Sequence, residues 1–329
     1  MGVTIKEIAQ LCGVSAGTVD RALNDRLGIN PKTKLKILEV AKALNYQPDH
    51  TARSLAKGKT MTLGVVLFDL YNRSFSQLMN AIEVRSKEFG YFVHPVLTDK
   101  DPNDEKMLLQ HLINRKVDGI ILFSVNKGEK FNDYLQSLNI PLVTICNLVS
   151  DDWSYVGIND RQAMKDAVYH VVGKGYRRIV YICPPLAYKG LSNIYTQEER
   201  VNGLMEGIAE MRVSIGTEII TAKDYIGALD QMELIGEEKT AILCSCDNYA
   251  LEVMNYLKSK KYHIPQDVGL MGFDNIDVLK YVTPQLTTVE YAIEEIGIKA
   301  VDCLIDRIES GSYSPVPLIG HRLIFGESI

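Results

Sequence analysis

The chain has 329 residues, of which 46% are hydrophobic and 23% charged, and its formal net charge is −5 at pH 7. This length accommodates several domains, and no apolar run approaches the roughly 18 residues that a membrane-spanning helix needs. Because the N-terminus carries no secretory signal and the six cysteines are typical of small core residues, we expect a cytoplasmic protein without disulfides.

Charge is distributed unevenly along the chain. Residues 1–60 contain ten lysines and arginines and five acidic residues, a net charge of +5. The total of −5 therefore leaves residues 61–329 with −10. Positive charge concentrated in one short segment favours contact with the phosphates of a nucleic acid.

The first predicted elements are two short helices joined by a tight turn. Thr4 precedes the first helix and Glu7 follows three residues later, which is the capping-box pattern. Gly13 permits the turn, and Ser15 caps the second helix. An outward face of the second helix can enter a major groove. That face carries Ala16, Gly17, Asp20, Arg21 and Asn24.

A third amphipathic helix and a basic segment follow. The helix is predicted over residues 31–46, and its apolar residues close a small core. They are Leu35, Leu38, Ala41 and Leu44. Residues 49–57 are too few to form a stable helix alone, so we expect them to order on DNA. An ordinary helical hairpin is the alternative, but the third helix, the positive charge and the basic segment favour a DNA-binding unit.

From residue 61 onward, continuous apolar runs alternate with helical patterns. Such runs are typical of parallel strands covered on both faces. The strands are predicted at residues 62–68, 119–123, 142–146, 179–183, 241–245, 268–273 and 322–325. The helices are predicted at residues 77–89, 105–116, 162–174, 197–211 and 248–260. This alternation predicts a doubly wound α/β architecture, in which ligands bind at the carboxyl ends of the strands.

The N-terminal residues resemble the headpiece of the LacI family of bacterial regulators, and the following stretches carry the similarity. They are Thr4-Ile5, Ile8-Ala9, Val14-Ser15, Thr18-Val19, Leu23-Asn24, Tyr46, Pro48, Ala52-Arg53 and Leu55. The rest resembles the periplasmic sugar-binding fold that this family carries behind its headpiece. The matching stretches are residues 70–75, 140–144, 155–160, 199–203, 246–250, 268–274 and 286–289. Together they extend over nearly the whole chain.

The resemblance implies three segments. They are a helix-turn-helix DNA-binding domain at 1–47, a hinge helix and linker at 48–60, and an effector-binding domain at 61–329. The last divides into an N-lobe, residues 61–159 and 292–320, and a C-lobe, residues 160–291 and 321–329. The fold class is thus an all-α headpiece followed by an α/β two-lobed domain. The implied function is a transcriptional regulator, a repressor, whose affinity for operator DNA is controlled by a small sugar-like effector between two hinged lobes. A phosphate-bearing or purine ligand is the alternative effector within the same function, although the acidic residues of the predicted site disfavour a strongly anionic one.

Side-chain chemistry suggests how the headpiece contacts double-stranded DNA. We expect Arg21 to bind a guanine and Ala16 to contact a thymine methyl group. The polar residues near the helix ends would hold the phosphate backbone, and the resemblance places Leu55 in a central base step, inserted from the minor groove. The predicted DNA-binding set is Thr4, Ser15, Ala16, Gly17, Thr18, Arg21, Asn24, His50, Ala52, Arg53 and Leu55. Two headpieces on a near-palindromic operator imply a homodimer.

The resemblance also implies an effector site, mostly just past predicted strands or at a lobe crossing. Carboxylates, amides and an arginine suit the hydroxyls of a sugar, and aromatic rings cover its apolar face. The predicted set is Tyr71, Asn72, Phe75, Asn147, Arg200, Asp247, Asp274 and Tyr291. Cys246 stands where many relatives have asparagine, which removes an expected hydrogen bond.

The alternative from another class is an α/β sugar- or nucleoside-handling enzyme, or a binding protein, with an accessory basic N-terminal module. An enzyme of this kind needs a phosphate loop or a metal-binding carboxylate cluster, and neither pattern occurs in the sequence. We therefore expect no catalytic residues, no metal and no cofactor.

Overall fold

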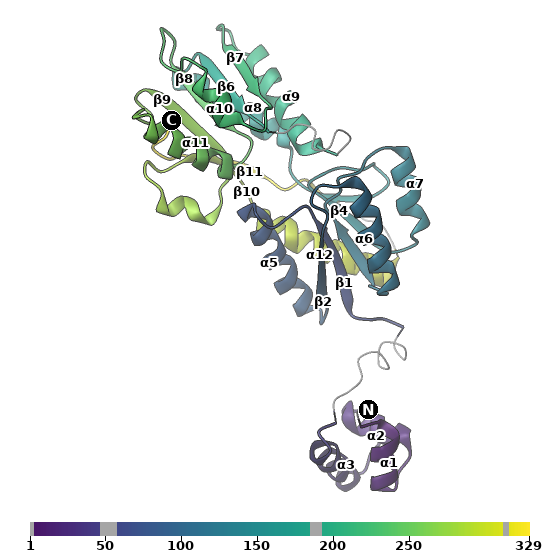
Figure 1. The fold of residues 1–329 in the computed structure, drawn as a ribbon. Helices are drawn as coiled ribbons and strands as arrows, with labels where there is room; N and C mark the ends of the chain where they lie inside the picture. The colour runs from purple at the N-terminus through teal and green to yellow at the C-terminus, as the bar shows by residue number, and fades with distance from the viewer. Residues whose placement is uncertain (1–2, 47–57, 185–192, 312–315) are drawn as a thin grey trace. The chain divides into compact units, whose positions relative to one another are not determined.

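The computed structural model describes residues 3–46, 58–184, 193–311 and 316–329. The chain divides into two units, residues 1–60 and 61–329, each with its own core (Figure 1). Within the described residues, no helix is both long and apolar enough to cross a membrane.

The first unit is a three-helix headpiece made of α1 (Ile5–Cys12), α2 (Ala16–Leu23) and α3 (Pro31–Ala43). The predicted capping box is present, because Glu7 N–H donates to Thr4 Oγ1 and Thr4 N–H donates to a Glu7 carboxylate oxygen. Gly13 ends α1 in the left-handed region at φ 71°, where glycine has no steric penalty. The predicted helix-turn-helix start and turn are therefore confirmed.

The core-facing side of α3 differs from the sequence prediction. Leu35 and Leu38 are 60% and 40% exposed, whereas Ile37 is fully buried. Successive side chains along an α-helix are rotated by about 100° about the helix axis. The apolar stripe that contains Ile37 therefore lies on a different side of α3 from the stripe that contains Leu35. Both stripes share Ala41, and contact with α1 and α2 selects the one that contains Ile37.

The predicted N-lobe contains a parallel sheet in the order β2-β1-β3-β4-β5. Its strands are β1 (Thr62–Leu67), β2 (Phe92–Leu97), β3 (Gly119–Leu122), β4 (Leu142–Ile145) and β5 (Ser154–Val156). Its helices are α5 (Arg73–Glu88), α6 (Pro102–Asn114), α7 (Glu129–Ser137) and α12 (Ile293–Ser310). The long helix α12 packs against α5 and contacts β3, β4 and β5, so a segment from late in the chain completes this lobe (Figure 1).

The predicted C-lobe contains a six-stranded sheet in the order β11-β10-β9-β8-β6-β7, parallel except for β11. Its strands are β6 (Arg178–Ile182), β7 (Gly216–Ile220), β8 (Thr240–Cys244), β9 (Val268–Asp274), β10 (Thr287–Tyr291) and β11 (His321–Ile324). Its helices are α8 (Asp160–Gly173), α9 (Tyr195–Ala209), α10 (Tyr225–Asp230), α11 (Asp247–Ser259) and the 3₁₀ helix η2 (Asp277–Tyr281). The two sheets with their helices confirm the predicted doubly wound α/β class.

Three connections join the two sheets, between β5 and α8, between β10 and α12, and between α12 and β11. Two of them run side by side, because Ile158 and Ile319 form a parallel β-bridge. The carboxyl ends of β4, β8 and β9 lead into the segments that carry the polar residues described next.

Candidate functional sites

The outward face of α2 is the first candidate site. Ala16, Gly17 and Arg21 are exposed there, and Asn24 follows as the C-cap of the helix. A Cβ atom added at Gly17 would approach only the Ser15 hydroxyl oxygen, at 3.9 Å. This side of the helix is therefore exposed, and no other part of the headpiece lies within 4 Å of a Cβ atom at Gly17.

Local hydrogen bonds hold the polar residues of this face. Ser15 Oγ accepts from Thr18 N–H, and the two hydroxyl oxygens lie 2.9 Å apart. The Asn24 amide donates to Asp20 Oδ1 over 2.8 Å, and Arg26 lies 3.5 Å from the same carboxylate. Asp20 is thus compensated within the headpiece, which lowers its repulsion of a nearby phosphate.

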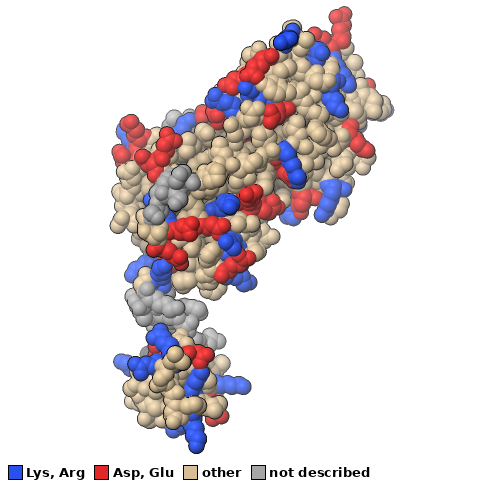
Figure 2. All heavy atoms as spheres, turned by 180° about the vertical axis from the view of Figure 1, so that it is seen from behind, with Lys and Arg blue, Asp and Glu red and all other residues tan. Residues whose placement is uncertain are grey.

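Cations outnumber acidic groups on the headpiece. Figure 2 shows more blue than red on its visible face, whereas the two colours are mixed over the larger unit. The cationic residues described between positions 3 and 46 are Lys6, Arg21, Arg26, Lys32, Lys34, Lys36 and Lys42. Such a surface suits a polyanion.

The remaining predicted DNA-binding residues lie outside the described part of the chain, as does the predicted hinge helix at 49–57. They are His50, Ala52, Arg53 and Leu55.

The second candidate site is a cavity of about 340 Å³ lined by residues of both lobes. Seven of the eight predicted effector-site residues line it. They are Tyr71, Asn72, Phe75, Asn147, Arg200, Asp274 and Tyr291. The eighth, Asp247, is not among the lining residues.

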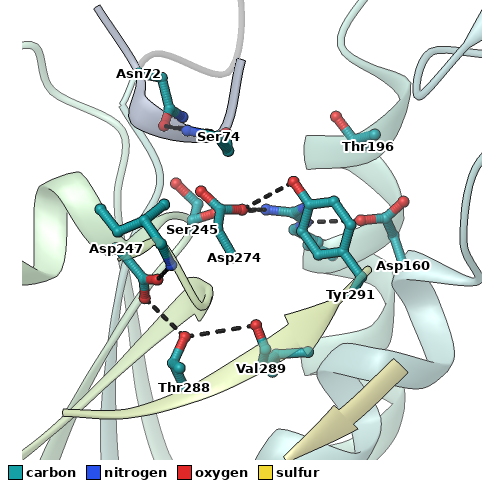
Figure 3. Close-up of polar contacts among 12 residues, drawn as sticks. Asn72, Ser74, Asp160, Thr196, Ser245, Asp247, Asp274, Thr288, Val289 and Tyr291 are labelled. Atoms are coloured by element: carbon teal, nitrogen blue, oxygen red, sulfur yellow. Dashed lines mark hydrogen bonds and ion pairs between the residues drawn. The ribbon is translucent and has the colours of Figure 1, made fainter. Parts of the chain in front are cut away.

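A buried ionic group forms one wall of the cavity (Figure 3). Arg200, on α9, donates from Nε to Asp160 Oδ1 over 2.7 Å and from Nη1 to the Ser245 carbonyl oxygen over 2.5 Å. Its guanidinium lies 3.6 Å from the Phe273 ring centroid and 4.0 Å from Asp274 Oδ1. Burial of both carboxylates raises their pKa values, and the guanidinium opposes this. One cation thus faces two carboxylates that come from distant parts of the sequence.

A glycine allows Arg200 to lie this close to Asp160. Gly203 follows one turn later on α9, where a Cβ atom would lie 2.2 Å from the carbonyl oxygen of Arg161 on α8. Backbone atoms cannot move aside as a flexible side chain can, so this helix crossing requires glycine.

Asp274 lies at the end of β9 and is only 4% exposed. Its Oδ1 accepts from the Tyr291 hydroxyl over 3.0 Å, whereas Oδ2 has no hydrogen-bond partner within the described residues. Burial raises the pKa of Asp274 to about 8. Its backbone has a φ of 125°, which an L residue rarely adopts. Strained backbone and an unpaired buried oxygen are features that cluster at binding sites.

The N-lobe wall is mainly aromatic. Phe68, Phe75 and Phe123 form a cluster in which Phe75 meets the other two rings nearly edge-on, at centroid distances of 5.9 and 5.3 Å. Tyr71 is 92% exposed, and Asn72 caps α5 by accepting from Ser74. Together these residues offer an apolar surface beside polar groups.

Asn147 lines the cavity, but its amide is engaged in holding the lobes together. Its amino group donates to the carbonyl oxygens of Ser124 and Asn193, and its oxygen accepts from Thr196 N–H. Elsewhere Arg73 of α5 forms a bidentate pair with Asp277 of η2, over 2.8 and 2.9 Å. The cavity is therefore bordered by direct contacts between the lobes.

The side chain of Asp247 is used inside the C-lobe instead. Its two oxygens accept from the Thr288 hydroxyl and from Ile276 N–H, over 2.7 and 2.9 Å. The next residue, Asn248, lines the cavity. A step of one residue at the start of α11 turns a side chain by about 100°, which separates these two positions.

Sequence reasoning did not select several polar residues that line the cavity. They are Asp69, Ser74, Lys100, Asp160, Asn193, Thr196, Gln197, Ser245, Asn248, Tyr249 and Glu252. Three sequence stretches that carry the family resemblance, residues 70–75, 155–160 and 246–250, contain Ser74, Asp160, Asn248 and Tyr249, so a signal existed for these four. The others are gathered from separate segments by the tertiary fold.

Among the described residues, no three or more His, Cys, Asp and Glu side chains form a group that could hold a metal ion. Burial raises the pKa of the lining thiols Cys146 and Cys246, which disfavours the reactive thiolate.

Two family models match the chain. Residues 4–49 match the model of bacterial regulatory proteins of the lacI family, and residues 168–329 match that of the periplasmic binding protein-like domain. Catabolite control protein A of Priestia megaterium is 29% identical over 337 residues, covering 100% of this chain and 99% of that protein. The probable HTH-type transcriptional repressor ExuR of Bacillus subtilis is 30% identical, covering 93% of this chain and 92% of the relative. These relatives are transcription regulators rather than enzymes.

Solved structures show the same fold. The lac repressor dimer bound to operator and the anti-inducer ONPF has a TM-score of 0.86 at 21% identity, covering 100% of this chain and 99% of that one. A periplasmic binding protein/LacI transcriptional regulator from Alkaliphilus metalliredigens, complexed with D-xylulofuranose, has a TM-score of 0.68 at 25% identity. It covers 82% of this chain and 98% of its own.

Proposed function

Because this chain belongs to the lacI family of bacterial regulatory proteins, and so is a DNA-binding transcriptional regulator, we propose that a small sugar-like effector in the cavity controls its affinity for operator DNA. One observation carries the effector part of this proposal. The cavity has a buried arginine, an unpaired carboxylate oxygen and an aromatic wall, which together match the hydroxyls and the apolar face of a sugar ring.

The DNA contacts are assigned to two segments. On α2, Arg21 is the residue for guanine recognition and Ala16 for a thymine methyl, with Gly17 leaving room for close approach. The hydroxyls and amide at the helix ends contact phosphates. They belong to Thr4, Ser15, Thr18 and Asn24. In the second segment, His50, Ala52 and Arg53 contact DNA, and Leu55 wedges a base step from the minor groove.

The effector contacts are assigned to Arg200, Asp274, Tyr291 and Asn248 for the polar edge, with Tyr71, Asn72 and Phe75 on the N-lobe side. Asn147 and Asp247 act as positioning residues, because their polar atoms bond within the protein. Effector binding changes the closure of the lobes, and lobe closure changes the spacing of two headpieces. The D-xylulofuranose complex of the Alkaliphilus relative supports a sugar as the class of effector.

A homodimer follows from the operator geometry. Two headpieces on a near-palindrome require a two-fold assembly with half-sites about one helical turn apart. The lac repressor, solved as a dimer on its operator, supports this assembly. Because its target is the bacterial genome, the protein acts in the cytoplasm.

Selection of genomic DNA tests the regulator function. Purified protein is mixed with fragmented DNA of its own genome at physiological salt, and the retained fragments are sequenced. A few fragments that share a near-palindrome are expected. Uniform retention across sequences would contradict sequence-specific regulation, since non-specific binding depends on phosphates alone.

A sugar panel on the selected fragments then tests the effector. We expect at least one sugar to change operator affinity about tenfold or more, because coupling free energies of 1–3 kcal/mol correspond to about 5- to 150-fold. No response to any sugar would remove the effector proposal and leave the DNA-binding function in place.

A further inference from the structure

The outward face of α2 offers few polar groups to a base. Ala16 and Gly17 have no hydrogen-bonding side chain, and Asp20 follows Ala16 by one turn, in the middle of the face. The amino group of Asn24 donates to the backbone oxygen and to Oδ1 of Asp20, over 2.9 and 2.8 Å, which uses both of its hydrogens. Asp20 and Arg21 are therefore the side chains best placed on this face to bond a base.

The Asp20 carboxylate is held in place but keeps acceptor capacity. Asn24 binds Oδ1, and Arg26 Nη1 lies 3.5 Å from Oδ2. A carboxylate accepts about four hydrogen bonds, and the described residues supply these two partners. The side chain of Asp20 is 40% exposed, so a further donor can reach it. A group that is already ordered loses less conformational freedom when it binds, and the guanidinium beside it offsets its repulsion of phosphates.

The chemistry of the major groove selects the base that suits a carboxylate. The hydrogen-bond donors there are the amino groups of cytosine and adenine. Adenine places the acceptor N7 beside its amino group, and guanine and thymine present only acceptors for hydrogen bonds, all of which repel a carboxylate oxygen. Cytosine presents its amino group without an acceptor beside it. A carboxylate on a recognition helix therefore favours cytosine.

We propose that Asp20 is a specificity-determining residue, whose carboxylate accepts a hydrogen from the amino group of one cytosine in each half-site of the operator. The inference rests on the proposed entry of α2 into the major groove, and it adds a base contact to those assigned to Arg21 and Ala16. Successive side chains on a helix point about 100° apart, so Asp20 and Arg21 contact different base pairs.

Selection of DNA by the full-length protein tests this contact. Wild type and Asp20→Asn are each incubated with a pool of random sequences, and the retained DNA is sequenced. Wild type should retain a C·G pair at one fixed position of each half-site, and its replacement by T·A should lower affinity about tenfold. A carboxamide both donates and accepts, as the edge of adenine requires. The variant should therefore select adenine at that position and leave the other positions unchanged.

Asp25→Asn is the matched control, because it removes the same charge from an exposed side chain, which pairs with Lys34. It should raise affinity for all sequences alike and keep the cytosine, since only phosphate repulsion changes. If Asp20→Asn does the same, Asp20 acts through its charge alone and the proposal is overturned. A selected palindrome without a fixed C·G pair overturns it too but leaves the regulator function intact, whereas selection of no shared sequence contradicts both.

Modified DNA tests the same contact with wild-type protein. N4-methylcytosine carries a methyl group in place of the amino hydrogen that faces the major groove, and it keeps the base pair. At the fixed position it should weaken binding of wild type about tenfold and leave binding of Asp20→Ala unchanged. Equal effects on the two proteins overturn the proposal.

Discussion

The outward face of α2 and the cavity between the lobes differ in where the partners of their charged side chains come from. On α2, Asp20 is compensated by Asn24 and Arg26, which lie within six residues of it on the surface. In the cavity, Arg200 is compensated by residues 40 and 74 positions away in the sequence, Asp160 and Asp274, and all three are buried. A surface group is solvated and screened by water, whereas a buried charge depends on its partners. Substitutions on α2 should therefore change DNA contacts first, and those in the cavity should change stability as well.

The largest expected effect is that of Arg200→Ala. Removing the guanidinium leaves two buried carboxylates without their cation, and breaking a buried pair costs about 3–5 kcal/mol. We expect this loss in urea unfolding of the effector domain, together with loss of the effector response, while operator binding persists below the unfolding transition. Arg73→Ala is the matched control, because its pair with Asp277 is exposed and solvent screens it, so its loss should cost far less. Equal losses in the two variants would contradict the assigned difference between buried and exposed charge.

A second test uses Glu105, a fully buried carboxyl that supports the cavity loop. Its oxygens accept from Ser124 Oγ, Val125 N–H and the Asn126 amide, and Val125 lines the cavity. Burial raises the pKa of Glu105 from 4.5 to about 7, against the effect of these hydrogen bonds. Because the folded-state pKa is the higher one, its contribution to stability is fully present below pH 4.5 and is lost as pH rises through about 7.

Glu105→Gln should remove this pH dependence. The difference in unfolding free energy between wild type and variant is expected to change by a few kcal/mol from pH 4.5 to 7 and then to level off. Urea unfolding at a series of pH values measures it. A difference that stays constant over this range would show that Glu105 titrates as an ordinary carboxyl.

Gly203→Ala should have a smaller effect and tests how the cavity is assembled. The added methyl group meets the backbone of Arg161, so α9 has to move away from α8, at a cost of about 1–3 kcal/mol. Gly173→Ala is the control, because nothing lies within 4 Å of a Cβ atom there, at the end of α8. Thermal unfolding of both variants compares them. If Gly203→Ala is as stable as the control, the close crossing is not what places Arg200 beside Asp160.

The smallest effect on stability is expected for a substitution at the exposed start of α2. Ser15→Ala removes the N-cap bond to Thr18 N–H and should cost the headpiece about 1 kcal/mol. Operator affinity should fall with it, while effector affinity remains unchanged. Headpiece melting and DNA titration at fixed salt measure both. A change in effector affinity would mean that the two regions are not energetically separate in this respect.

The strands show where local sequence was sufficient. Central strands such as β3, β8 and β9 are buried along their whole length, and their continuous apolar runs predicted them within one or two residues. The edge strands β2 and β7 are mostly exposed or half-buried, and the short β5 covers only three residues. Since an edge strand has a neighbour on one side only, it needs no apolar run, and its hydrogen-bond partners do not show in the local pattern.

The sequence by itself determined the helix starts at Thr4 and Ser15, the turn at Gly13, the central strands other than β10, and the family resemblance. These features depend on neighbours a few residues apart, such as a hydroxyl and the N–H that it caps. Only the tertiary structure decided that α3 buries Ile37 rather than Leu35, that Asn248 rather than Asp247 lines the cavity, and that Asp160 holds Arg200. Each of these choices depends on how a helix is rotated against distant elements. A rotation of about 100° per residue exchanges a buried side chain for an exposed one without any change in the local pattern.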